Sequence, residues 1–350
     1  MWGASLSAYD NSNPAAAIFG CGGLELTDWE RDFFRDLNPL GFILFARNIE
    51  DPYQVQALTD DLRSCVTHPD VPILIDQEGG RVARLRPPHW REAPTAAKIG
   101  ELAVFNLEMG LEAAHLNARL FASELMDLGI NVDCAPVLDI PVEDADPIIS
   151  DRAYAPHPEL AAVMGRAACR GFMAGGVLPV IKHIPGHGRA LVDSHKALPV
   201  VDTAFDILDS VDFRPFVELA DMPWAMTAHI VYSDIDQFAP ATMSPRLIED
   251  VIRHHIGFNG ILISDDLSMH ALEGDFSARA ETALEAGCDL VLHCNGNKEE
   301  MLAVADGLRP ISDGTDDRLE AGWKMTRENL EEIDFDQAEN RFNTLMELVT

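Results

Sequence analysis

The sequence predicts an α/β protein of the (β/α)8 TIM-barrel class, with residues 1–350 forming a single domain. Short apolar runs alternate along the chain with amphipathic segments of helical pattern, as in βαβ units that build a parallel sheet. Eight such runs occur, and eight repeats favour a closed barrel over an open doubly wound sheet. A length of 350 residues suits one large barrel, although two smaller domains would also fit. No Ser/Gly-rich linker, charge block or low-complexity run divides the chain, so we expect one domain.

Each of the eight apolar runs is expected to be a buried parallel strand. Most are almost continuously apolar rather than alternating, which is typical of strands covered on both faces. The expected strands lie near Ala15–Gly22, Gly41–Ala46, Val71–Asp76, Ile130–Asp139, Val177–His183, Trp224–His229, Gly260–Asp265 and Leu290–Asn295.

The segments between the strands carry apolar residues at helical spacing. The clearest of these segments are Tyr53–Val66, Asn106–Leu128, Pro158–Ala174 and Phe276–Glu285. The C-terminal stretch Asp316–Val349 is polar, with apolar residues at the same spacing. We expect this stretch to form terminal helices that pack outside the barrel.

The charge balance excludes two classes of partner. The chain has 58 acidic and 26 basic residues, which gives a formal net charge of -32. A surface this acidic repels nucleic acid and anionic lipid, so neither is expected as a main partner. The oligomeric state stays open.

Cysteine usage and the chain start predict a cytoplasmic protein. The six cysteines form no C-x-x-C pair and show no spacing typical of a disulfide framework, which favours a reducing compartment. The first 20 residues lack the basic region and apolar core of a secretory signal. No apolar run is long enough to cross a bilayer, so we expect no membrane segment.

Ionisable residues gather at the ends of four expected strands. These strand ends are Asp76 on the third strand, Lys182-His183 on the fifth, Thr227–His229 on the sixth and Ser264–Asp266 on the seventh. Active sites of (β/α)8 barrels lie at the C-terminal ends of the strands. The sequence therefore predicts that these side chains share one site at one face of the barrel.

Several of these residues also have a structural interpretation. Asp266 could cap the following helix, because Asp accepts hydrogen bonds from free N–H groups there. Asp76 could pair with Arg81 or Arg84. One of Asp265 and Asp266 should face the barrel axis, since side chains alternate along a strand, but the periodicity does not say which.

The histidines and glycines of these segments have structural interpretations as well. The histidines that could each be a buried, fully paired core residue are His183, His187 and His229. Gly79, Gly80, Gly186 and Gly188 are expected at turns that need unusual backbone angles. A phosphate-binding loop is not expected, because no Lys-Ser or Lys-Thr pair follows these glycines.

Two linked motifs resemble a known family. Lys182–Gly188 reads K-H-I-P-G-H-G and is followed by Asp193–His195, which reads D-S-H. Together they resemble the K-H-F-P-G-H-G…D-S-H signature of the glycoside hydrolase family 3 β-N-acetylglucosaminidases. Further segments match the same enzymes in order, namely Asp76–Val82, Thr227–His229 and the nucleophile-like segment Ser264–Met269. The similarity runs from about residue 20 to residue 295, and the single-barrel length resembles the short bacterial form that works in cell-wall recycling.

The chain departs from the family pattern at two places. Ile184 stands where the family usually has Phe, which is a conservative change. Arg189 and Ala190 occupy a variable turn where some members have Asp-Thr, which could alter the mobility of the loop. Neither departure removes a catalytic group.

The resemblance implies a role for each matched residue. Asp265 matches the nucleophile, His195 the general acid/base and Asp193 the partner of His195. The residues implied to hold the terminal N-acetylglucosamine are Asp76, Arg84, Arg152, Lys182 and His183. The implied substrate is a muropeptide that carries N-acetylglucosamine on 1,6-anhydro-N-acetylmuramic acid, and no cofactor or metal is implied.

The implied chemistry is physically reasonable. A carboxylate at the barrel mouth can attack the anomeric carbon and form a covalent glycosyl-enzyme. His195 would replace the usual second carboxylic acid, because histidine titrates near neutral pH and can donate and then accept a proton. Asp193 would orient the imidazole and stabilise its charged form. Both residues follow the fifth strand in a loop, which we expect to be mobile and to close over the sugar.

Three alternatives compete with this interpretation. A zinc hydrolase has enough histidines in His183, His187, His195 and His229, but Pro185 and the glycines break the helix that would align the first two. A phosphorylase on the same scaffold is possible, because a neutral histidine does not repel phosphate. A non-catalytic sugar-binding protein would not need the complete acid, base and nucleophile set.

Overall fold

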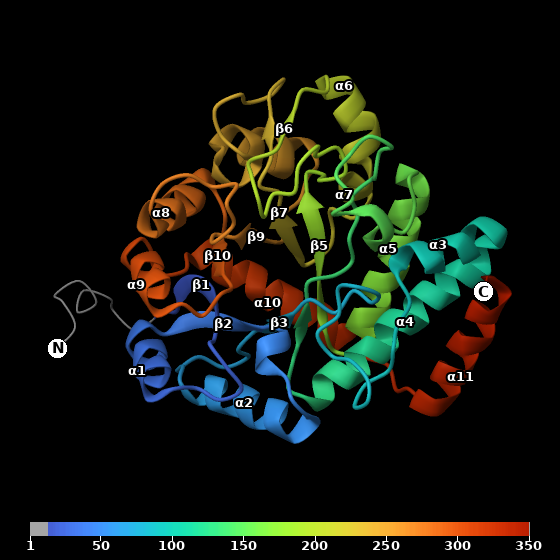
Figure 1. Cartoon of the computed structure of the whole chain (residues 1–350), viewed down its shortest axis with the longest axis horizontal. Helices are drawn as coiled ribbons and strands as arrows, with labels where there is room; N and C mark the ends of the chain where they lie inside the picture. Colours follow the sequence, from blue (N-terminus) through green and yellow to red (C-terminus); the bar gives the residue numbers. More distant parts are fainter. Residues whose placement is uncertain (1–12, 350) are drawn as a thin grey trace.

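Eight parallel strands form a closed barrel in this computed structural model, which describes residues 13–349 (Figure 1). Around the barrel the order is β1-β2-β3-β4-β5-β7-β9-β10, and β10 pairs back with β1. The strands are Ala15–Gly20 (β1), Pro39–Leu44 (β2), Ile73–Ile75 (β3), Val132–Asp133 (β4), Leu178–Ile184 (β5), Trp224–Thr227 (β7), Ile261–Asp266 (β9) and Leu290–His293 (β10). The predicted (β/α)8 barrel is therefore confirmed. Residues 1–12, on which the expectation about a signal segment partly rests, lie outside the described residues.

All eight predicted strands are present, but the fourth is much shorter than predicted. Only Val132–Asp133 of the predicted run pairs as a strand. Pro136 follows closely and has no N–H to donate to a ladder, so regular pairing stops and only an isolated bridge joins Val137 to Lys182. Asp139, which ended the predicted strand, consequently lies beyond it.

Helices follow the strands and surround the barrel (Figure 1). They are Asp28–Leu37 (α1), Pro52–Ser64 (α2), Ala96–Phe105 (α3), Leu107–Asp127 (α4), Pro158–Ala174 (α5), Phe205–Ile207 (α6), Arg214–Glu218 (α7), Phe276–Ala286 (α8), Lys298–Asp306 (α9), Asp313–Glu328 (α10) and Phe335–Met346 (α11). Two π-helical segments, Leu208–Asp212 and Leu247–His255, complete the ring. No helix within residues 13–349 has the length and apolar character needed to span a membrane.

The helix starts follow from local capping. At α1 the Thr27 side chain accepts from the backbone N–H of Glu30, and the Glu30 carboxylate accepts from the backbone N–H of Thr27. This reciprocal capping box satisfies two N–H groups that the helix cannot pair internally. The C-terminal stretch also forms helices as predicted: α10 packs against α5, β5 and β9, and α11 packs against α4.

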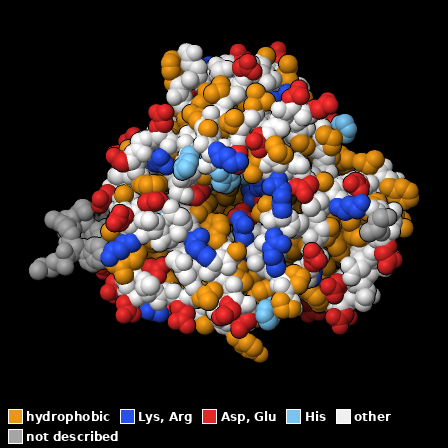
Figure 2. Space-filling view, viewed as in Figure 1, with side chains coloured by type: hydrophobic (Ala, Val, Ile, Leu, Met, Phe, Trp, Pro, Cys, Tyr) orange, Lys and Arg blue, Asp and Glu red, His pale blue; other side chains and the backbone are white. Residues whose placement is uncertain are grey.

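The polar ends of the strands share one mouth of the barrel. Residues along β1, β2 and β5 are buried, so the barrel wall itself is core. A two-stranded parallel sheet of Val200–Val201 (β6) and Val231–Tyr232 (β8) follows the C-terminal ends of β5 and β7. Figure 2 shows a hollow near the middle of the molecule with basic side chains around it, while acidic side chains are scattered over the rest of this face.

Candidate active site

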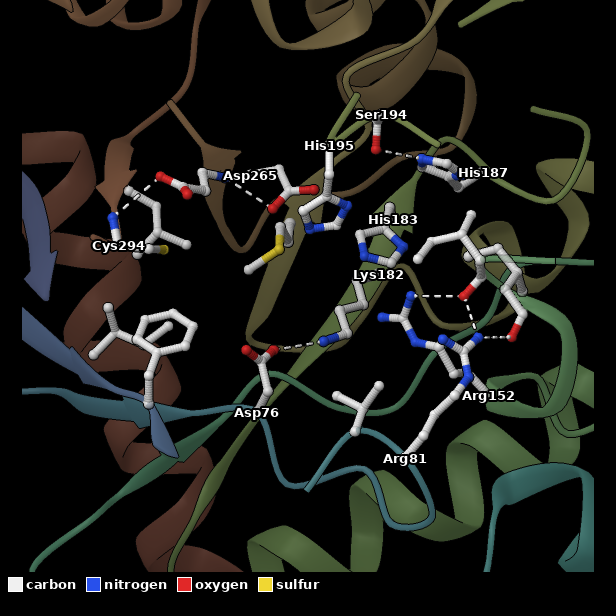
Figure 3. Close-up of a pocket in the computed structure, with 18 of the residues that line it drawn as sticks. Asp76, Arg81, Arg152, Lys182, His183, His187, Ser194, His195, Asp265 and Cys294 are labelled. Atoms are coloured by element: carbon white, nitrogen blue, oxygen red, sulfur yellow. Dashed lines mark hydrogen bonds and ion pairs between the residues drawn. The ribbon is translucent and has the colours of Figure 1, made fainter. Parts of the chain in front are cut away.

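A cavity of about 270 Å³ lies at the C-terminal mouth of the barrel (Figure 3). It brings together seven of the eight predicted site residues: Asp76, Arg84, Arg152, Lys182, His183, His195 and Asp265. The eighth, Asp193, does not line the cavity but hydrogen-bonds to His195. The predicted residues therefore form one site, although they lie on β5 and β9 and in the loops that follow β3, β4 and β5.

Asp265 and Asp266 end β9, and both line the cavity. The Asp266 carboxylate is occupied by protein donors, because Oδ1 accepts from the backbone N–H of Ser268 at 3.0 Å and of Cys294 at 3.1 Å, and Oδ2 accepts from the Ser268 hydroxyl. Within residues 13–349, by contrast, the one donor to the Asp265 carboxylate is the backbone N–H of Asp266, which lies 2.8 Å from Oδ1. Asp265 is thus the carboxylate available to a ligand.

The helix-cap interpretation of Asp266 is wrong. The next helix, α8, begins only at Phe276, and the side chain of Asp275 caps it. Asp266 instead ties the turn after β9 to the end of β10 through Ser268 and Cys294.

The carboxyl group of Asp265 is held in its ionised form. Burial would raise the pKa of this group, but the neighbouring His229 and His183 outweigh burial and lower it. The backbone N–H of Asp266 lowers the pKa further, because it donates to the charged form. A nucleophilic carboxylate is therefore present at neutral pH.

His195 and Asp193 form a hydrogen-bonded pair on the loop between β5 and β6. His195 Nδ1 lies 2.8 Å from Asp193 Oδ1, and the backbone N–H of His195 donates to the same oxygen at 2.9 Å. Burial would raise the pKa of Asp193, but these hydrogen bonds and the one from Lys196 lower it to about 2. An ionised carboxylate only accepts hydrogen bonds, so Nδ1 must carry a proton and Nε2 is free for acid–base work.

Asp76 sits between two cations on the cavity floor. Its Oδ1 is 2.8 Å from Lys182 Nζ, and its Oδ2 is 2.9 Å from Arg84 Nη2. Burial would raise the pKa of Asp76, yet Lys182 and Arg84 together lower it well below its usual range. Of the two arginines proposed as partners for Asp76, Arg84 is the correct one. Arg81 pairs with Asp151 instead.

Two buried acids that sequence reasoning did not single out hold this cavity together. Glu78 accepts from Arg152 through both oxygens at 2.8 Å and lies 2.6 Å from Lys182 Nζ. Asp139 Oδ2 is 2.7 Å from His183 Nδ1, and Asp139 Oδ1 accepts from the backbone N–H of His183. In the sequence, only their positions pointed to these roles. Glu78 lies two residues after Asp76, and Asp139 ends a predicted strand.

The remaining histidines differ in role. His229 is a satisfied core residue, because Nδ1 bonds Thr242 Oγ1 at 2.7 Å and Nε2 bonds the Asp266 carbonyl at 3.0 Å. His187 lines the cavity, and its Nε2 lies 3.0 Å from the hydroxyl of Ser194. Burial, then the neighbouring His183, lowers the pKa of His187 to about 4, so its ring is neutral at physiological pH.

Three of the four glycines expected to need unusual backbone angles have them: Gly79 (φ +97°) and Gly80 (φ +55°) in the turn after β3, and Gly186 (φ +143°) just after β5. The prediction is wrong for Gly188, which has no positive φ. In the part of the chain that the structure describes, no three His, Cys, Asp or Glu side chains lie together so that they could hold a metal ion.

The chain matches known proteins over most of its length. Residues 26–319 match the glycosyl hydrolase family 3 N-terminal domain. The β-hexosaminidase of Methylobacillus flagellatus is 38% identical over 289 residues, covering 80% of this chain and 81% of that protein. The β-hexosaminidase of Methylococcus capsulatus is 38% identical over 310 residues, covering 87% and 90%. The crystal structure of NagZ from Neisseria gonorrhoeae in complex with N-trifluoroacetyl-D-glucosamine has a TM-score of 0.85 at 29% identity, and the match covers 95% of this chain and 98% of that one.

Proposed function

Because the chain belongs to glycosyl hydrolase family 3 and is a β-N-acetylhexosaminidase, we propose that it is a retaining exo-enzyme that acts through a covalent glycosyl-enzyme on Asp265. The enzyme releases one β-linked N-acetylglucosamine at a time from a non-reducing end. The observation that carries this proposal is the presence of a free, ionised Asp265 and the His195–Asp193 pair at one cavity.

The two chemical steps follow from these groups. Asp265 attacks the anomeric carbon while His195 Nε2 gives its proton to the departing glycosidic oxygen. The neutral imidazole then accepts a proton from a water molecule, which attacks the glycosyl-enzyme and releases the sugar. Asp193 stays ionised throughout, because its pKa is about 2, and stabilises the imidazolium form of His195. Two inversions give net retention.

The residues around Asp76 bind the terminal sugar in this proposal. Ion pairs with neighbouring side chains keep these groups charged. Asp76 pairs with Lys182 and Arg84, and Arg152 pairs with Glu78. A small cavity of about 270 Å³ suits one monosaccharide unit rather than the interior of a polymer. The N-trifluoroacetyl-D-glucosamine in the neisserial NagZ complex supports the same sugar class.

We further propose that the natural substrate is a 1,6-anhydro-muropeptide and that the enzyme works in the cytoplasm in peptidoglycan recycling. We also propose that the barrel and its terminal helices act as one domain. Support comes from the short bacterial relatives and from the six cysteines, each of which is buried and unpaired in the structure. Unpaired thiols suit a reducing compartment.

One experiment tests the substrate class most sharply. Release of chromophore is compared for matched aryl β-N-acetylglucosaminide, β-N-acetylgalactosaminide and β-glucoside substrates. We expect the N-acetylglucosaminide to be hydrolysed fastest. Faster release from the β-glucoside would contradict the proposal.

A phosphorylase remains a second candidate because the proton donor is a histidine. A carboxylic acid becomes an anion after it donates and then repels phosphate, whereas an imidazole becomes neutral. Rates with and without inorganic phosphate separate the two reactions. Formation of N-acetylglucosamine 1-phosphate at a rate above hydrolysis would favour the phosphorylase.

A further inference from the structure

A buried ion pair ties the loop that carries His195 to the outside of the barrel. Arg189 Nε donates to Asp212 Oδ2 at 2.7 Å. The Asp212 side chain is 1% exposed and that of Arg189 is 20% exposed. Arg189 lies six residues before His195, in the variable turn of the family motif.

Asp212 belongs to a buried and closely packed part of the molecule. It ends the π-helix Leu208–Asp212, and the adjoining Phe213 is completely buried. Gly186, in the same loop as Arg189, packs so closely on Asp212 that a Cβ added to the glycine would lie 3.1 Å from the Cβ of Asp212. The Tyr232 hydroxyl donates to the Gly186 carbonyl at 2.6 Å, which fixes the loop base to the same wall.

Polar contacts of His187 hold the loop on both sides of its exposed tip. The backbone N–H of His187 donates to buried Asp139 at 2.6 Å, and the ring of His187 contacts Ser194 at 3.0 Å. Between these points the loop tip is exposed, with 64% of Leu191 and 40% of Val192 accessible. Arg189 is therefore the charged side chain that anchors the part of the loop between β5 and the exposed tip.

We propose that Arg189 and Asp212 are positioning residues, whose ion pair sets the path of the loop so that His195 Nε2 reaches the glycosidic oxygen. This inference rests on the proposed role of His195 as the general acid. Neither residue lines the substrate cavity, so the effect must pass through the loop.

Loss of Arg189 should have a large effect on the loop, because the buried Asp212 carboxylate depends on Arg189 for charge compensation. Within the described residues, Asp212 Oδ1 is buried and has no hydrogen-bond partner, so Arg189 provides the carboxylate with its charged partner. Removal of Arg189 leaves a buried carboxylate without compensation. The segment must then move or take up a proton, and either response disturbs the loop base.

The test compares leaving groups in Arg189→Met, which keeps an apolar stem, and in Asp212→Asn, which keeps the side-chain shape. A poor leaving group needs the proton from His195, whereas 2,4-dinitrophenolate departs without it. We expect kcat/KM to fall about tenfold for an N-acetylglucosamine disaccharide, a part of the about 10²–10⁴-fold acid–base contribution, and less than about twofold for the dinitrophenyl glycoside. Arg189→Lys should recover part of the loss, and the double variant should lose little more than either single variant.

Arg253→Met is the control for loss of an ion pair far from the cavity, although Asp289 keeps Arg318 as a second partner at 3.0 Å. Arg253 pairs with buried Asp289 at 2.8 Å, with side chains 11% and 6% exposed. Asp289 directly precedes β10, at the opposite end of the barrel from the cavity. This variant should lower the melting temperature and leave the ratio of the two kcat/KM values unchanged.

The outcomes separate this inference from the proposed function. If Arg189→Met and Asp212→Asn slow both substrates equally, the pair only stabilises the fold and the inference is wrong. If Arg189→Met does not fold, Arg189→Lys and Asp212→Asn provide the same comparison. If His195→Ala itself shows no dependence on the leaving group, the proposed acid is wrong. If His195→Ala shows that dependence and the ion-pair variants do not, only the inference fails.

Discussion

Asp265 and Asp266 are neighbours on β9, yet their carboxylates are held in opposite ways. Asp266 accepts from Ser268 and Cys294 and so joins the turn after β9 to the end of β10. Asp265 accepts one backbone N–H and otherwise faces the cavity as an anion. The local fold thus assigns a structural role to one carboxylate and leaves the other free to react.

Asp265→Asn should abolish turnover while the fold is retained, because the amide keeps the shape but has no nucleophilic charge. We expect a loss of roughly 10⁴–10⁶-fold in kcat, the range for removal of one member of a catalytic triad. Asp266→Asn should act mainly on stability, by about 1–2 kcal/mol for its disturbed hydrogen bonds. Steady-state kinetics and thermal unfolding of both variants check this. A larger loss of kcat in Asp266→Asn would mean that the nucleophile is misassigned.

The fold was predictable because each barrel strand carries its own signal. Strands buried on both faces read as apolar runs, and the polar residues that end them marked the mouth of the barrel. The fourth strand shows where this signal fails. An apolar run indicates that a segment is buried, but it does not show where the regular strand pairing ends. In the fourth strand Pro136 interrupts this pairing.

The supporting acids were harder to predict because their partners are distant in sequence. Glu78 and Arg152 are 74 residues apart, and Asp139 and His183 are 44 apart. No periodicity links residues across two loops. The motif containing Asp265 could be matched directly, whereas the acids that fix the sugar-binding cations become visible only when the loops meet in three dimensions.

Glu78→Gln should destabilise the protein and weaken substrate binding. Glu78 is 5% exposed and pairs with both Arg152 and Lys182, so among the described residues the amide leaves buried Arg152 without its charged partner and Lys182 paired with Asp76 alone, at a cost of about 3–5 kcal/mol. The KM should rise, because these cations lose their orientation. Urea unfolding and steady-state kinetics measure the two effects. Unchanged stability at pH 7 would show that the ion network is not coupled to folding.

The same carboxylate makes a pH-dependent contribution. Burial would raise the pKa of Glu78, but Lys182 and Arg152 lower it from 4.5 to about 2. The folded state therefore holds fewer protons than the unfolded state between these values. The stabilisation is complete above pH 4.5 and is lost as the pH falls toward 2. The stability difference between wild type and Glu78→Gln should shrink over that window.

Asp212 should show the opposite dependence on pH. Burial raises its pKa from 3.8 to about 6 despite the hydrogen bond and charge of Arg189, with Asp139 adding to the rise. Between these values the folded state keeps a proton that the unfolded state has lost, so stability decreases as pH rises from about 4 to 6. Asp212→Asn removes this dependence. Relative to wild type, the variant should gain at most about 3 kcal/mol across that window, measured by urea unfolding at each pH. A constant difference would contradict the raised pKa.

His195→Ala should separate the two steps of the proposed mechanism. In the structure Nδ1 is committed to Asp193 and the ring is 62% exposed, so Nε2 can exchange protons with solvent. Without this acid, hydrolysis of a disaccharide should slow by about 10²–10⁴-fold, because a sugar alkoxide leaves poorly unless it is protonated. Glycosylation by a 2,4-dinitrophenyl glycoside should be much less affected. Pre-steady-state release of dinitrophenolate measures that step alone.

The second step also needs His195, because water must lose a proton to attack the glycosyl-enzyme. With the dinitrophenyl substrate, His195→Ala should therefore show a burst and accumulate a glycosyl adduct on Asp265, detectable by mass spectrometry of the intact protein. Azide needs no base, so it should restore turnover and give the β-glycosyl azide, since two inversions retain the configuration. The Asp265→Asn control should show neither burst nor rescue. If His195→Ala slows both substrates equally, with no burst and no azide product, another residue carries the proton and His195 only shapes the site.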